Sequence, residues 1–155
     1  MTTKEMLQDF PGRPNKSVSA SRPERMTYAR DMATISSRRE ALVLKISDDV
    51  ALFKAERGGA LAKVYDYIDA RCHIAAATMK KVLLGQSIIT REFLYKYTVG
   101  LDMPLEKAQA YFELQDGRLR DDSDWAEMIV FNALRDRDGV DSLKEQFQHL
   151  LGKKL

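Results

Sequence analysis

Cys72 and His73 stand side by side and come closest, by residue type, to metal or nucleophile chemistry. Thiolate and imidazole groups bind zinc, but structural sites use four ligands and catalytic sites three. The sequence holds no third ligand near this pair, and His149 is the only other histidine. A single cysteine also excludes a disulfide within the chain. We therefore predict no metal site and expect Cys72 to be a buried cysteine where two helices meet.

Three aspartates, Asp121, Asp122 and Asp124, have the spacing of a fragment of a calcium loop. The loop glycine and the terminal glutamate are missing, so we interpret the aspartates as a linker and as charge at a helix N-terminus. The sequence also lacks a Gly-rich phosphate loop, a nucleophile elbow and a His-Glu-x-x-His helix. We therefore expect a protein that is not an enzyme and needs no cofactor; a small-molecule or metal-responsive enzyme is the least favoured alternative.

Charge is unevenly distributed along the 155 residues, although the formal net charge is only +2. Residues 1–40 and 61–100 each carry +3, residues 41–60 are neutral, and residues 101–155 carry −4. This split suggests that the first 100 residues face an anionic partner, with chance scatter of solvated charges as the alternative. The sequence shows neither a secretory signal nor a run of about 20 apolar residues, so we expect a cytoplasmic protein without membrane contact.

Apolar residues recur at helical spacing over most of the chain. Leu42, Ile46, Val50 and Phe53 form one stripe that ends before two glycines at 58 and 59. A hairpin is the alternative there, because apolar residues also alternate over 42–46. Further helices are predicted at 60–71, 75–84, 91–99 and 104–115, then after a cap at Ser123 and after a cap at Asp141. The expected fold is all-α, a compact bundle of about six to eight short helices with a flexible N-terminal tail.

Within these helices, the spacing predicts which residues form the core and which end the helices. Thr90 is expected to cap one helix and Gly100 to end it, while Pro104 occupies a first helical position. Trp125 and Phe131 are expected in the core or on a dimer surface rather than in a ligand pocket. The other inward residues are predicted to be Leu61, Val64, Tyr65, Ile68, Met79, Val82, Leu83, Phe93, Leu94, Tyr97, Leu105, Ala108, Tyr111, Phe112, Met128, Ile129, Ala133, Leu143, Phe147, Leu150 and Leu151.

Two predicted helices meet around residues 72–74, where Ile74 can plug a tight turn. Ile68 before the turn and Met79 and Val82 after it fit the inward positions of a helix-turn-helix unit. The run over 73–85 resembles the phage-repressor-like (XRE, Cro/C1-type) helix-turn-helix family at Ile74, Thr78, Met79 and Gly85. Residues 90–94 and 100–108 are similar to the fourth helix of that family and its exit. The resemblance covers about residues 61–151 and is closest over 61–115.

The resemblance implies a lambda-repressor-like fold and a DNA-binding transcriptional regulator of bacterial or phage type, repressor-like, that contacts double-stranded DNA. It places Ala75 at the cap of a recognition helix, with Ala76, Ala77 and Thr78 nearest the base edges. Lys80 and Lys81 would project from the exposed side toward bases or phosphates, and Gln86 and Ser87 would approach the DNA backbone. Arg91 and Lys96 would add further phosphate contacts. The C-terminal helices would form a homodimer or bind a protein partner. The implied organisation is a flexible tail at 1–23, an N-terminal helical segment at 24–59, a helix-turn-helix domain at 60–117 and a C-terminal helical extension at 118–155.

Three features depart from the family pattern. His73 stands where the family usually has glycine, and Ala75 stands where it usually has a serine cap. Alanines occupy the leading positions for reading bases, where they can touch a thymine methyl but cannot form paired hydrogen bonds. Weak sequence reading is therefore expected. The alternative is a helical protein-interaction module, adaptor or antitoxin-like, that keeps the scaffold without reading DNA specifically. Residues 1–40 fit either a minor-groove arm or a plain tail.

Overall fold

The computed structural model describes residues 22–120, 122 and 124–155. The chain divides into two units, Met1–Ser37 and Arg38–Leu155, and helix α2 (Arg22–Glu56) contributes to both. The described part of the first unit is helical and exposes Met32 and Ile35. The predicted tail at 1–23 lies outside the described residues, except that Arg22 and Pro23 already belong to α2.

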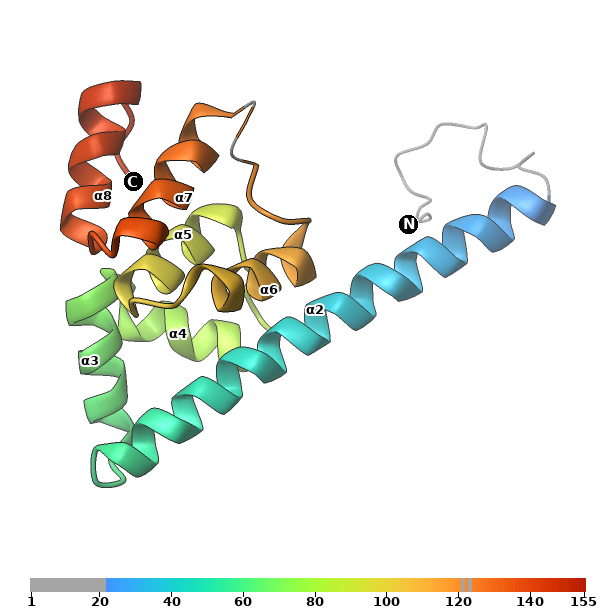
Figure 1. The fold of residues 1–155 in the computed structure, drawn as a ribbon. Coiled ribbons are helices and arrows are strands. Elements are labelled where there is room, and N and C mark those ends of the chain that lie inside the picture. The colour runs from blue at the N-terminus through green and yellow to red at the C-terminus, as the bar shows by residue number, and fades with distance from the viewer. Residues whose placement is uncertain (1–21, 121, 123) are drawn as a thin grey trace. The chain divides into compact units, whose positions relative to one another are not determined.

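The second unit is built from helices, and the described residues include no strand. The prediction of an all-α fold is therefore confirmed. The expectation of only short helices is not met by α2, because the stretches on both sides of residue 38 form one helix of 35 residues. The remaining elements, shown in Figure 1, are α3 (Leu61–Cys72), α4 (Ala76–Leu83), α5 (Arg91–Gly100), α6 (Leu105–Gln115), α7 (Trp125–Asp136), α8 (Val140–Gln146) and the π-helical turn η2 (Phe147–Leu151).

Helix α5 lies at the centre of the second unit and contacts α3, α6, α7 and α8 (Figure 1). Its sequence explains this position, because apolar or aromatic residues fall on every side of the helix instead of on one stripe. Seven of its ten residues are buried: Phe93, Leu94, Tyr95, Tyr97, Thr98, Val99 and Gly100. The central helix therefore holds α3 and α4 on one side and the C-terminal helices on another.

Local signals set most helix boundaries. The Thr90 side chain accepts a hydrogen bond from the Phe93 N–H at 3.0 Å, which confirms the predicted cap of α5. At α7 the cap is Asp124, whose carboxylate accepts from the backbone N–H groups of Ala126 and Glu127. The predicted cap Ser123 lies outside the described residues. The last helix begins two residues earlier than a cap at Asp141 would place it, directly after Gly139.

Gly100 has a different role from the predicted helix-ending glycine. It is the last residue of α5 and is buried, and Leu101 follows as the C-cap. A Cβ atom added at Gly100 would lie 2.6 Å from the Arg71 carbonyl oxygen and 2.7 Å from both Cα and Sγ of Cys72. The missing side chain is what lets α5 approach the end of α3 this closely. Cys72 is buried at this contact, as expected.

The predicted core is largely confirmed, with exceptions at three large residues. Leu42, Ile46, Val64, Ile68, Met79, Val82, Leu94, Tyr97, Phe112, Ile129, Ala133, Leu143 and Phe147 are among the buried residues. Leu61, Trp125 and Leu150 are exposed instead, with Trp125 at 71% and Leu150 at 62%. Helical spacing identifies an apolar face but does not show whether another element covers it.

Candidate functional site

Residues 73–75 join α3 to α4. The chain leaves α3 at His73, whose φ of 57° and ψ of 42° are left-handed and whose N–H donates to the Asp69 carbonyl at 2.9 Å. Ile74 is buried, and Ala75 is extended, with a φ of −64° and a ψ of 148°. The tight connection and its apolar plug therefore lie where the sequence predicts them.

Two residues of this connection carry conformational costs. A non-glycine residue in the left-handed region is strained by about 1 kcal/mol or more. His73 is nevertheless held there, and its Nε2 lies 3.1 Å from Oδ1 of Asp141 at the start of α8. Ala75 gives α4 no side-chain cap, which forgoes a bond worth about 0.5–2 kcal/mol.

The outer face of α4 carries small residues and lysines. Met79 and Val82 are buried, whereas Ala77, Thr78 and Lys81 are exposed. Residues three or four positions apart on a helix are neighbours, so these exposed residues lie together. The structure thus brings three of the predicted contacts of α4, namely Ala77, Thr78 and Lys81, onto one accessible face.

The flanks of this face differ from each other. Lys80 is exposed, but its Nζ lies 5.8 Å from the ring centroid of Tyr65, over α3. Ala76 is half-buried and Ala75 is exposed at the first turn. Lys80 therefore lies on the α3 side of α4, in contact with an aromatic ring.

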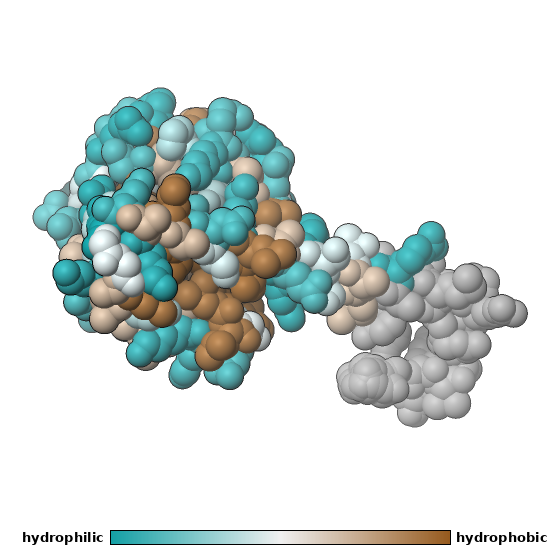
Figure 2. Space-filling view, turned by 90° about the horizontal axis from the view of Figure 1, so that it is seen from below, coloured by the Kyte–Doolittle hydropathy of each residue, from teal (hydrophilic) through white to brown (hydrophobic). Residues whose placement is uncertain are grey.

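The segment between α4 and α5 combines polar and apolar residues. Gln86 is exposed and Ser87 is half-buried, and both lie beyond the C-terminal end of α4. Leu84 and Ile88 are 69% and 70% exposed on either side of them. Figure 2 shows apolar side chains gathered into a patch on one face of the second unit. Exposed apolar side chains next to polar ones, as at residues 84–88, are typical of a recognition surface.

Arg91 does not lie with the other predicted DNA contacts. Its guanidinium donates to the Glu127 carboxylate at 2.7 and 3.2 Å, and to the carbonyl oxygen of Gly117 at 2.7 Å. It also donates to Gln115 at 3.1 Å and to the Arg118 carbonyl at 3.2 Å. The donors that would meet a phosphate are thus used to join α5, α7 and the chain after α6.

Glu127 is the acceptor at the centre of this arrangement and is only 3% exposed. Besides Arg91, it accepts a hydrogen bond from the Arg120 N–H at 3.0 Å and a short one from the Tyr95 hydroxyl. Burial, with the hydrogen bond to Glu127, raises the pKa of Tyr95 above its usual value of 10.0. The sequence analysis missed Glu127. Its position three residues after Asp124 is typical of a capping box within α7, which does not indicate a partner in α5.

Asp49 forms a second buried carboxylate cluster on α2. It accepts hydrogen bonds from the hydroxyls of Tyr97 at 2.8 Å and Tyr111 at 2.5 Å, and Lys107 Nζ lies 4.0 Å away. Burial, reinforced by Asp49, raises the pKa values of both tyrosines. These contacts join α2, α5 and α6, so Asp49 has a structural role and does not form part of an open site.

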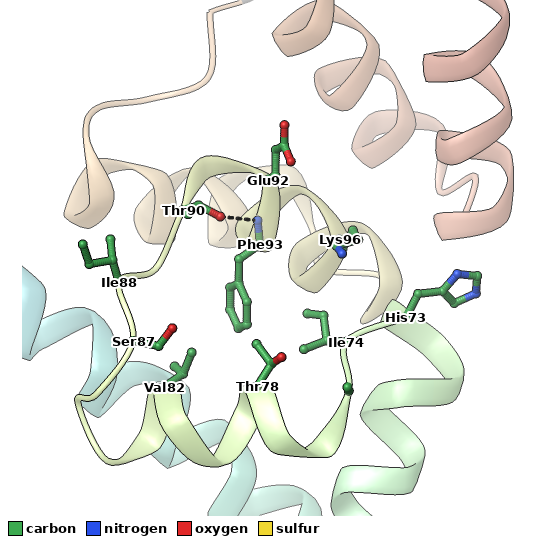
Figure 3. A pocket seen from close by; sticks show the side chains of 11 residues that line it. His73, Ile74, Thr78, Val82, Ser87, Ile88, Thr90, Glu92, Phe93 and Lys96 are labelled. Carbon is green, nitrogen blue, oxygen red and sulfur yellow. Dashed lines mark hydrogen bonds between the residues drawn. The ribbon is translucent and has the colours of Figure 1, made fainter. Parts of the chain in front are cut away.

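A groove of about 420 Å³ lies between α4 and the start of α5 (Figure 3). Its floor is apolar: in Figure 3, Phe93 of α5 points toward Thr78 and Val82 of α4, and Ile74 closes one end. The full lining consists of His73, Ile74, Ala75, Thr78, Val82, Ser87, Ile88, Thr90, Glu92, Phe93 and Lys96. Lys96, a predicted phosphate contact, therefore lies at this groove together with Thr78 and Ser87.

The groove could not be predicted from sequence spacing, because the apolar residues of its floor have the same spacing as core residues. Phe93 and Val82 are predicted to be inward and are indeed buried, yet they also line the opening. The one available signal is Ile88, an apolar residue in a polar connecting segment. Its exposure shows that the segment does not cover the groove with apolar side chains.

No model of a protein family, no curated protein and no solved structure matches this chain. Among the residues that the structure describes, none of the helices combines the length and the apolar character needed to cross a membrane. The same part of the chain contains no group of three or more His, Cys, Asp or Glu side chains placed to hold a metal ion.

Proposed function

We propose that residues 60–117 act as a helix-turn-helix unit of the phage-repressor-like type and that the protein is a DNA-binding transcriptional regulator. The observation that carries this proposal is the joint between α3 and α4. Its buried plug Ile74 and the inward residues Met79 and Val82 fix α4 from below, which leaves Ala77, Thr78 and Lys81 accessible. A recognition helix requires this division into a packed face and a free face.

In the proposed complex, α4 enters the major groove. Ala76, Ala77 and Thr78 approach base edges near its N-terminal end, where they offer methyl groups and one hydroxyl. Lys81 extends from the free face toward phosphates or bases, and Lys80 reaches them from the side of α3. Gln86, Ser87 and Lys96 approach the DNA backbone. Arg91 is left out of the interface because its guanidinium is bound to Glu127.

This surface supplies more affinity than discrimination. Lysines neutralise phosphates irrespective of sequence, and each phosphate contact makes binding weaker as salt rises. The alanines forgo paired hydrogen bonds, each worth about 1–3 kcal/mol of discrimination. We therefore infer that the protein binds many duplexes with steep salt dependence and prefers its own site by a modest factor.

A salt series with random duplexes tests the proposal. The wild type should enrich a sequence motif, and Lys80→Ala/Lys81→Ala should lower the slope of log K against log salt by about two, roughly one per lost phosphate contact. Lys153→Ala/Lys154→Ala is the matched control, because it removes the same charge from two exposed residues far along the chain. Equal slopes for the two double variants would exclude α4 as the DNA-binding helix.

The groove favours a second candidate function, a protein-interaction module. Val82 and Phe93 on its floor and the exposed Leu84 and Ile88 are suited to an apolar side chain of a partner. On this function, Ile88→Ala would weaken capture of a stoichiometric partner but leave duplex binding nearly unchanged, because it removes apolar surface without adding charge beside the proposed backbone contacts. If the wild type binds duplexes but captures no stoichiometric partner, the regulator function alone is supported.

A further inference from the structure

Trp125 is the one tryptophan of the chain, and it is exposed. It is the first residue of α7, next to the capping residue Asp124, and Asp122 precedes it. Tryptophan carries the largest apolar surface of any side chain, and its exposure leaves that surface in water. Exposed tryptophans of this kind are typical anchors of protein interfaces. The second unit thus presents an aromatic anchor with acidic neighbours.

The groove between α4 and α5 has properties that match such an anchor. Its volume of about 420 Å³ leaves room for a large aromatic side chain, and Val82 and Phe93 provide an apolar floor. An indole also needs an acceptor for its N–H when it leaves water. The hydroxyls of Thr78 and Ser87 line the groove and can accept that hydrogen bond (Figure 3).

The charges around the two features are complementary. Lys96 lines the groove, and Lys81 lies three residues after Thr78 on the exposed face of α4. Trp125 is accompanied by Asp122 and Asp124, both exposed. Glu92 also borders the groove, but in Figure 3 its carboxylate points away from the opening. Two aspartates would therefore meet two lysines when Trp125 enters the groove.

We propose that Trp125 of one copy of this chain docks in the groove between α4 and α5 of a second copy. Within one copy, Trp125 is exposed and the groove is open, so the two features are not used by each other in the same chain. A two-fold pair would use each anchor and each groove once and would close the assembly. The inference does not require DNA binding. Because the docked indole would cover Thr78, Ser87 and Lys96, which are also proposed DNA contacts, a given copy would use its groove either for the second copy or for DNA.

Tryptophan emission of the full-length chain reports docking directly, because Trp125 is the only source of indole fluorescence. On raising the protein concentration, the emission should shift to shorter wavelength as the indole leaves water, in step with a doubling of mass in sedimentation equilibrium. A chain that remains a monomer with unshifted emission up to millimolar concentration would overturn the proposal.

Three variants test the partners of the contact. Trp125→Ala should weaken association by about 30-fold or more, as expected of an interface anchor. Ile88→Glu places a negative charge beside the groove, on a residue exposed enough for the fold to tolerate it, and should weaken association while leaving its own tryptophan emission at long wavelength. Leu150→Ala removes another exposed apolar side chain and serves as the control, with association expected to be unchanged.

Complementation decides between this contact and other surfaces. A mixture of Trp125→Ala, which keeps the groove, and Ile88→Glu, which keeps the anchor, should form a one-to-one pair at concentrations where each variant alone remains a monomer. Lys96→Glu should weaken association, and Asp122→Lys on the partner copy should restore it. Association of Trp125→Ala as tight as that of the wild type would show that the copies pair through another surface. An emission shift that appears only on adding a foreign acidic peptide would show that another occupant uses the groove. Either result would overturn the proposal.

Discussion

The guanidinium of Arg91 and the carboxylate of Glu127 form a two-point ion pair, with N–O distances of 2.7 and 3.2 Å, between the first turn of α5 and the first turn of α7. The pair is partly shielded, because the side chain of Arg91 is 23% exposed and that of Glu127 is 5% exposed. Glu127 also holds the Arg120 N–H, so the same carboxylate fixes the segment that leads into α7. This ion pair is one of the contacts that attach the C-terminal helices to α5, beside the packing of α7 and α8 against it.

Removing the charge of Glu127 should loosen that attachment. Glu127→Gln keeps the shape of the side chain but leaves a shielded guanidinium without its counter-charge, so it should lower the free energy of unfolding by about 3 kcal/mol. Urea unfolding followed by circular dichroism measures this change. Glu113→Gln is the control: it breaks an exposed ion pair with Arg118 and should cost less than about 1 kcal/mol. Equal losses in the two variants would contradict the role assigned to Glu127.

Gly100 should not tolerate even a methyl group. Glycine to alanine usually stabilises a helix by about 1 kcal/mol, but a Cβ here would lie 2.6 Å from the Arg71 carbonyl oxygen. That oxygen and the Cα atom of Cys72, which lies 2.7 Å from the added Cβ, are backbone atoms and cannot move away as the end of a flexible side chain could. We therefore expect Gly100→Ala to lower the free energy of unfolding by about 2 kcal/mol, the usual cost of overpacking. A gain of stability in thermal unfolding would show that α3 and α5 are not in such close contact.

Cys72 should be chemically inert in the folded protein. Burial raises the pKa of its thiol from 9.0 to about 12, although Arg71 and Lys96 act in the opposite direction. Because the thiolate is the reactive form, almost none is present at pH 8. A thiol reagent at pH 8 should therefore modify Cys72 only as fast as the chain opens, while the urea-unfolded chain reacts at once. Fast reaction of the folded chain would show that the contact between α3 and α5 opens readily.

Alkaline pH should destabilise the fold through Tyr95, Tyr97 and Tyr111. Burial raises the pKa of each above 10.0 in the folded state, so above pH 10 the unfolded chain loses protons that the folded chain keeps. Stability is therefore fully present below pH 10 and falls above it, by about 1.4 kcal/mol per pH unit for each phenol. Urea unfolding between pH 9 and pH 11 measures this slope.

Tyr97→Phe tests the origin of that slope. It removes one of the three phenols and should make the loss of stability above pH 10 less steep, even though it also removes a hydrogen bond to Asp49. Absorbance of tyrosinate provides a second measurement, since ionisation of the three buried phenols should coincide with unfolding. An unchanged slope in Tyr97→Phe would mean that this tyrosine ionises freely in the folded chain.

Local sequence signals predicted much of the helical architecture because they act within one turn. Thr90 caps α5 through its own side chain, and the glycines at 58 and 59 lie one residue beyond the end of α2. Ile74 could be assigned to the joint because a tight turn between helices needs an apolar plug. In each case the physical cause lies within a few residues of its effect.

Long-range relationships could not be read in the same way. Arg91 and Glu127 are 36 positions apart. An arginine in the sequence can equally form an internal ion pair or contact a phosphate, so the role of Arg91 could not be predicted. In the sequence, Gly100 resembles a helix-ending glycine. In the structure, a glycine is needed there because the backbone of α3 lies so close. Trp125 is an apolar residue at helical spacing from Met128 and Ile129, but this spacing does not show that its side chain is left exposed. These features depend on which helices pack together.

The proposed DNA interface makes a prediction at Ala77, which is exposed at the first turn of α4. Ala77→Glu places a negative charge where the proposed complex brings the helix closest to DNA. Glutamate forms helices well and suits a first turn, so the fold should be unaffected. Duplex binding at low salt should weaken by at least about tenfold, the effect of losing 1.4 kcal/mol. Ala62→Glu, at an exposed position in the first turn of α3, is the matched control and should change binding much less. Equal effects of the two substitutions would mean that net charge alone governs binding and that α4 does not enter the groove of the duplex.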